Sequence, residues 1–71
     1  MSMKIFGERL LELREEKNIS QATLAKAIGV SCGIICLWET DRSEPTAPNI
    51  VKLADYFGVS TDFLLGRRDD G

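Results

Sequence analysis

The chain has 71 residues and a formal net charge of −2, from 9 basic and 11 acidic side chains. This length suits one small domain, because domains typically have roughly 50 to 200 residues. The sequence pI near 5.0 argues against binding nucleic acid through bulk positive charge, since domains that bind in that way often have a pI above about 9.

The first predicted helix spans about residues 3–17. Phe6, Leu10 and Leu13 recur at i, i+4 and i+7 while charged residues fill the other faces, which is the spacing of an amphipathic helix. Asn18 ends this helix. No segment alternates between apolar and polar residues as a half-buried strand would, so the sequence predicts an all-α fold.

Two short helices follow, and a serine begins each of them. Ser20 is a favoured N-cap for the second helix, and Gly29 supplies the left-handed residue that ends it. Ser31 is the N-cap of the third helix, and the polar loop 40–45 follows, in which Asp41 tolerates a positive φ. The residues expected to face the core from these two helices are Leu24, Ala25, Ile28, Ile35 and Trp38.

A fourth helix and a short fifth helix complete the predicted bundle. Thr46 is the N-cap of the fourth helix, and Pro48 suits its first turn because the N–H that proline lacks has no partner there. Gly66 ends the fifth helix, so residues 1–66 form the predicted domain and residues 67–71 a flexible tail or the start of a linker. The other residues that mark helix ends or face the core are Ile50, Leu53, Ala54, Phe57, Gly58 and Ser60.

The residue counts argue against catalysis. No histidine is present, so the commonest general base and the commonest zinc ligand are both missing. Cys32 and Cys36 are too few for a structural zinc site or a disulfide scaffold, and no apolar run approaches the roughly 18 residues of a membrane span. We therefore expect a cytoplasmic protein that is not an enzyme, with no cofactor, no metal, no membrane contact and no evident small-molecule substrate.

The second and third predicted helices have the layout of a helix-turn-helix, because a three-residue turn that contains glycine joins them. Ala25 is small where the two helices would cross closely, and Gly29 makes the sharp turn without a Cβ penalty. Val30 is the apolar residue of the turn. Ile35 and Trp38 are expected to hold the third helix on the core.

Further motifs at matching spacing extend over about residues 6–66: Glu8-Arg9-Leu10, Leu13 to Lys17, Ile19-Ser20-Gln21, Leu24-Ala25, Ile28 to Ser31, Trp38-Glu39, Pro45, Leu53-Ala54, Phe57 to Ser60 and Asp62 to Gly66. With these motifs the chain resembles the phage-repressor and Cro-like (XRE-like) family of helix-turn-helix DNA-binding domains. The resemblance implies a compact five-helix, lambda-repressor-like bundle. It also implies a transcriptional regulator, expected to be a repressor, that binds double-stranded operator DNA as a homodimer with its third helix in the major groove.

The resemblance also assigns roles to single residues. Gln21 matches the family glutamine that opens the first helix of the motif, touches the DNA backbone and braces the third helix. Arg14 and Glu39 match an ion pair with a structural role between the first helix and the end of the third. Thr40 and Arg42 fall where the family places contacts to the DNA backbone.

Base edges in the major groove would meet the outward side of the third helix. Its residues offer little polar readout, because cysteine is a weak donor, glycine has no side chain and leucine can contact only a thymine methyl. Between residues 18 and 39 there is one basic residue, Lys26, and one acidic residue. The predicted DNA-binding residues are Ser20, Gln21, Ser31, Cys32, Gly33, Cys36, Leu37, Thr40 and Arg42.

Three hypotheses remain open at this point. The first is sequence-specific DNA binding by a dimer, in which backbone N–H groups, Gln21 and apolar contacts to thymine replace polar readout. The second is a protein-interaction module on the same fold, because Leu37, Ile34 and Leu11 are expected to be exposed apolar residues. The third is a thiol-sensitive regulator, in which oxidation or metal capture at Cys32 and Cys36 blocks the presumed DNA face.

Overall fold

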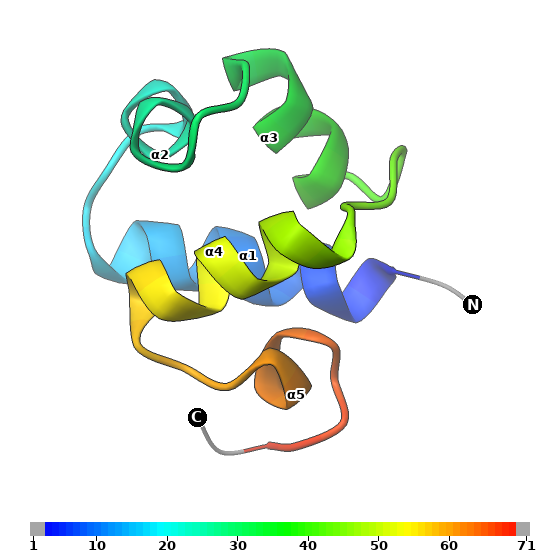
Figure 1. The fold of residues 1–71 in the computed structure, drawn as a ribbon. Helices are drawn as coiled ribbons and strands as arrows, with labels where there is room; N and C mark the ends of the chain where they lie inside the picture. The colour runs from blue at the N-terminus through cyan, green and yellow to red at the C-terminus, as the bar shows by residue number, and fades with distance from the viewer. Residues whose placement is uncertain (1–2, 70–71) are drawn as a thin grey trace.

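The computed structural model describes residues 3–69, which form five α-helices and no strand, as the sequence predicts. α1 and α4 run through the middle of the molecule, with α2 and α3 on one side of them and α5 on the other (Figure 1). This arrangement is the predicted five-helix bundle. The helices are α1 (Lys4–Glu16), α2 (Gln21–Ile28), α3 (Cys32–Glu39), α4 (Ala47–Phe57) and α5 (Thr61–Leu64).

Local hydrogen bonds and backbone conformations place the helix ends. The N-caps of α2, α3 and α5 are serines, and each hydroxyl oxygen accepts a hydrogen bond from the backbone N–H three residues later, at 3.0, 3.2 and 3.0 Å. Gly29 and Gly58 end α2 and α4 with φ of 80° and 68°. Asp41 adopts the expected positive φ, at 60°. Thr46 stands at the N-cap of α4 without a side-chain cap bond.

The core takes side chains from all five helices. Leu13, Ile50 and Phe57, which are predicted to face it, are partly buried and pack against it. Burial of Met3, just before α1, is not predicted by the helical spacing. The buried hydrophobic residues are Met3, Phe6, Leu10, Leu24, Ala25, Ile28, Ile35, Trp38, Leu53, Ala54 and Leu64.

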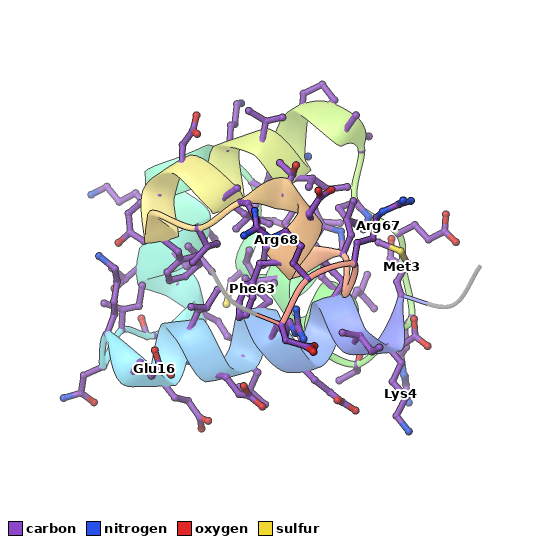
Figure 2. All side chains as sticks on the ribbon, turned by 90° about the horizontal axis from the view of Figure 1, so that it is seen from below. Met3, Lys4, Glu16, Phe63, Arg67 and Arg68 are labelled. Carbon is purple, nitrogen blue, oxygen red and sulfur yellow. The ribbon has the colours of Figure 1, made fainter. Side chains whose placement is uncertain are left out.

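The segment after α5 lies against α1 (Figure 2). Arg9 of α1 donates hydrogen bonds to the carbonyl oxygens of Phe63 and Arg68, and its guanidinium carbon lies 4.3 Å from the centroid of the Phe63 ring. Its Nη2 is 3.4 Å from a carboxylate oxygen of Asp69. One side chain thus holds the first part of the predicted tail. Residues 70–71 of that tail, and residues 1–2 of the predicted domain, lie outside the described residues.

Candidate nucleic-acid interface

α2 and α3 meet at a bend of 110°, which is the geometry of a helix-turn-helix. The backbone N–H groups of Gly29 and Val30 both donate to the carbonyl oxygen of Ala25, at 2.9 and 3.0 Å, and close the turn. Ile35 and Trp38 are buried, so the opposite side of α3 faces outward.

No single helix within residues 3–69 is long and apolar enough to cross a membrane. Together, α2 and α3 have sufficient length and apolar composition, but they are bent by 110° with respect to each other.

The outward side of α3 carries the four residues predicted to meet base edges. Ile34 and Leu11, which are predicted to be exposed, are instead partly buried. Ile34 lies one turn before the buried Trp38, and Leu11 lies one turn after the buried Gly7, so both share a face with a core residue. Of the three residues on which the protein-interaction hypothesis rests, Leu37 alone is exposed. The exposed set, called the reading face below, is Cys32, Gly33, Cys36 and Leu37.

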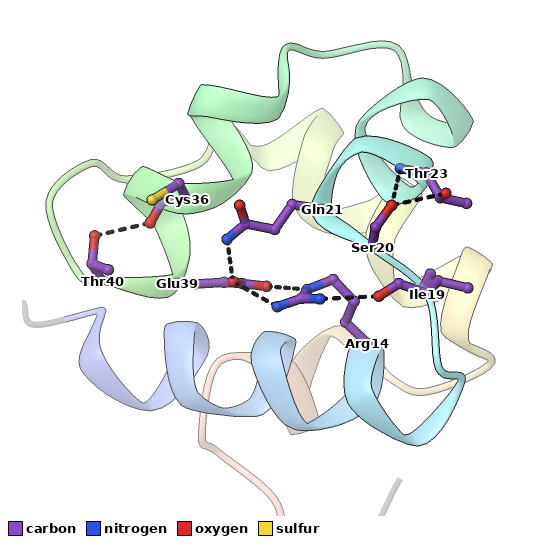
Figure 3. Close-up of polar contacts among 8 residues, drawn as sticks. All are labelled: Arg14, Ile19, Ser20, Gln21, Thr23, Cys36, Glu39 and Thr40. Carbon is purple, nitrogen blue, oxygen red and sulfur yellow. Dashed lines mark hydrogen bonds and ion pairs between the residues drawn. The ribbon is translucent and has the colours of Figure 1, made fainter.

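Arg14, Gln21 and Glu39 join three helices beside the reading face (Figure 3). Arg14 Nε lies 2.7 Å from Glu39 Oε2, and Arg14 Nη2 lies 3.2 Å from Oε1. Gln21 Nε2 donates to the same Oε1 at 2.8 Å, and Arg14 Nη1 donates to the carbonyl oxygen of Ile19 at 3.0 Å. The side chains of Arg14 and Glu39 are only 14% and 5% exposed, so little water competes for these bonds. The network holds the end of α3 to α1 and to the first residue of α2.

The guanidinium of Arg14 stays charged throughout the physiological pH range. The hydrogen bonds that Arg14 donates to the Glu39 carboxylate raise the pKa of Arg14, while burial acts in the opposite direction. Because the folded-state pKa lies above the unfolded value, this stabilisation is fully present below the unfolded value and is lost only as the pH rises through the folded one. Both values are strongly alkaline, so Arg14 acts as a permanent cation in this network.

The polar residues predicted to contact phosphates differ in the donors that remain to them. Gln21 keeps a second amide hydrogen after its bond to the carboxylate, and Ser31 accepts a cap bond and keeps its hydroxyl hydrogen. Ser20 caps α2 and also pairs with the hydroxyl of Thr23 at 3.0 Å. Thr40 already directs its hydroxyl and its backbone N–H at the carbonyl oxygen of Cys36, at 2.9 and 3.1 Å. The Thr40 hydroxyl must therefore turn before it can bind a phosphate.

Basic side chains are sparse around the reading face. Arg42 is exposed in the loop after α3, where its backbone N–H donates to the carbonyl oxygen of Leu37 at 2.9 Å. Lys26 instead lines a hollow between α2 and α4, together with Lys52 and Tyr56. Lys4 of α1 lines a second hollow with Glu39 and Thr40 at the end of α3. The exposed Arg42 and the backbone N–H groups at the N-terminal ends of α2 and α3 are therefore the groups expected to attract anions near the reading face.

Known proteins with the same architecture carry related sequences. The family model described as helix-turn-helix matches residues 10–64. Repressor protein C2 of Salmonella phage P22 is 37% identical over 65 residues, which are 92% of this chain and 30% of that protein. The cryptic phage CTXphi transcriptional repressor RstR of Vibrio cholerae is 42% identical over 65 residues, which are 92% of this chain and 57% of that protein. The chain thus spans about a third to just over half of the length of these relatives.

The similarity extends to three dimensions. The crystal structure of the P22 c2 repressor in complex with a synthetic operator superposes with a TM-score of 0.84 at 36% identity, covering 89% of this chain and 96% of that chain. The matched residues 10–64 include α2, the turn and α3 in full. The chain therefore belongs to the helix-turn-helix family, in its phage-repressor-like (XRE-like) group.

Proposed function

We propose that this chain is a sequence-specific DNA-binding transcriptional regulator that represses transcription by occupying operator DNA. The observation that carries the proposal is the exposed reading face of α3, a helix of 8 residues. Ile35 and Trp38 pack the opposite side of this helix into the core, so the reading face points outward. The crystal structure of a relative, the P22 c2 repressor, holds that protein in complex with a synthetic operator.

The proposed docking places α3 in the major groove, which is about 12 Å wide and admits one helix. The backbone N–H groups at the start of α2 and α3 then face phosphates, together with Gln21, Ser31 and Arg42. These contacts set the position on the duplex, whereas the reading face distinguishes bases. Leu37, which is 36% exposed, supplies apolar contact to thymine methyl groups.

One protomer offers few contacts of this kind, so we propose that a homodimer binds the operator. Two copies double the number of phosphate contacts and read two half-sites on one face of the duplex, roughly 34 Å apart. The operator is then an inverted repeat, because a two-fold symmetric protein reads the same bases twice.

The test is a fluorescence anisotropy titration at low salt with DNA from the promoter of the chain's own gene and with random duplex. We expect binding to the promoter DNA that is at least about tenfold tighter. Leu37→Glu should abolish this preference, because it places a charge where a base edge must pack. Val51→Glu is the matched control, since Val51 is a similarly exposed apolar residue, at 49%, on α4. Equal affinity for both duplexes, or equal loss in the two variants, would contradict the proposal.

The salt dependence of binding should be shallow and should depend on Arg42. Each neutralised phosphate contributes about −0.9 to the slope of log affinity against log salt concentration. With about two or three phosphates per protomer, Arg42→Gln should reduce the slope by about 1 per protomer. Arg67→Gln is the control, because Arg67 is exposed beyond α5, on the side of the bundle away from α3 (Figures 1 and 2). An unchanged slope in Arg42→Gln would exclude phosphate contact by this residue.

A further inference from the structure

The two cysteines of the chain lie together on the reading face. Cys32 and Cys36 are exposed free thiols, one helical turn apart on α3. Neither side chain packs in the core, and the fold does not need their sulfur atoms. Their placement at the surface that would meet DNA makes them a candidate ligand site.

The spacing of the pair does not suit a disulfide. Cβ atoms at i and i+4 of a helix lie about 5–6 Å apart, whereas a disulfide requires about 3.5–4.5 Å. A shared metal ion does not require the two sulfur atoms to touch. Two metal–sulfur bonds of about 2.3 Å allow these atoms to lie up to twice that length apart. Rotation about χ1 between staggered wells moves each sulfur atom relative to its Cβ, so the pair can reach that span without a change in the helix. The geometry favours one shared ion over a sulfur–sulfur bond.

The ligand set selects the kind of ion. Within residues 3–69 no group of three or more His, Cys, Asp or Glu side chains could hold a metal. Structural zinc sites use four protein ligands, and calcium and magnesium prefer oxygen. Two thiolates without further ligands suit a soft ion of low coordination number, and Cu(I) is the soft ion that thiolates select among the first-row metals.

We propose that Cys32 and Cys36 bind one Cu(I) ion per protomer and that the bound ion releases the protein from DNA. Two S–H bonds break, two Cu–S bonds form and two protons leave, with no change in oxidation state. Cu⁺ with two thiolates carries one negative charge, where two neutral thiols carried none. The reading face then repels the duplex, and few basic side chains lie near enough to compensate. The effect on DNA rests on the proposed function, whereas the ion site does not.

The ion site is tested by anaerobic titration of the reduced protein with Cu(I) against a chromophoric Cu(I) chelator. We expect one ion per protomer, bound at least about tenfold more tightly than by Cys32→Ser or Cys36→Ser, because each variant loses one of two metal–sulfur bonds. The double variant Cys36→Ser/Leu37→Cys keeps two thiols but rotates one of them by about 100° around the helix, and it should bind as weakly as the single variants. Equal affinity in any of these variants, or one ion shared by two protomers, would overturn the proposed site.

The effect on DNA is tested by adding one equivalent of Cu(I) to the protein–promoter complex in the anisotropy assay. We expect the affinity to fall at least about tenfold, and we expect Cu(I) to leave the affinity of Cys32→Ser/Cys36→Ser at its own starting value. If the metal-free protein binds promoter DNA and the loaded protein binds it equally well, release by the ion is wrong. If the metal-free protein shows no DNA binding while the titration finds the paired site, the proposed function fails and the ion site stands.

Discussion

Gly7→Ala is expected to lower the free energy of unfolding by about 2–3 kcal/mol, because α1 and α3 approach each other closely at this residue. A Cβ on Gly7 would lie 2.5 Å from the carbonyl oxygen of Trp38 and 3.0 Å from that of Glu39. Both are backbone atoms, so the end of α3 must move to admit the methyl group. For a chain of this length the total stability is about 4–11 kcal/mol, so the loss is a large part of it.

The control for this prediction is the same substitution in α3, at Gly33 of the reading face. Gly33 lies inside α3, and a Cβ there would have no heavy atom within 4 Å. Gly33→Ala should therefore raise the free energy of unfolding by about 0.5–1 kcal/mol through helix propensity alone. Urea denaturation of the two variants measures both effects. A stabilising Gly7→Ala would show that α1 and α3 lie farther apart than described.

Glu39→Ala is expected to cost about 3–5 kcal/mol, because it leaves the charge of Arg14 without its partner in a largely buried position. It also removes the acceptor of Gln21 and thereby loosens the contact between α2 and α3. Glu16→Ala is the control, since Glu16 is exposed at the end of α1 (Figure 2) and should change stability by less than about 0.5 kcal/mol. Thermal or urea denaturation gives the comparison.

A double variant separates the charge effect from a loss of packing. Arg14→Met/Glu39→Met removes both charges and should recover most of the stability lost in Glu39→Ala, because no ion is then left unpaired. If Glu39→Ala costs no more than Glu16→Ala, the network does not hold α3 to α1. If the double variant is as unstable as Glu39→Ala, the loss arises from packing at this position.

The helix ends and the two sides of α3 could be predicted from the sequence because they depend on local interactions. A serine cap needs only the backbone N–H three residues later, and Gly29 needs only its own φ. The burial of Ile35 and Trp38 follows from helical spacing, and the exposure of the reading face is its geometric complement.

The exposure predicted for Ile34 and Leu11 was wrong, because each lies one helical turn from a buried residue and shares a face with it. The place of Lys26 beside α4, and the hydrogen bonds that already occupy Thr40, depend on the path of the chain after each helix. The importance of Gly7 was also missed. An isolated glycine in a helical pattern is a usable signal for close packing. Its partners here, Trp38 and Glu39, are distant in the sequence, so local patterns cannot identify them.

The sequence by itself therefore determined the order of the helices, their caps and the chemical character of the reading face, since each is set within one or two helical turns. The tertiary structure alone decided two contacts between distant residues: the approach of α3 to Gly7, and the hydrogen bonds from Arg9 to the segment after α5. The contacts among Arg14, Gln21 and Glu39 were expected only from the family resemblance, and the tertiary structure supplies their geometry. These contacts depend on the angles at which helices cross, and those angles result from packing of the whole core. The position in which α3 presents its two thiols and Leu37 follows from these contacts.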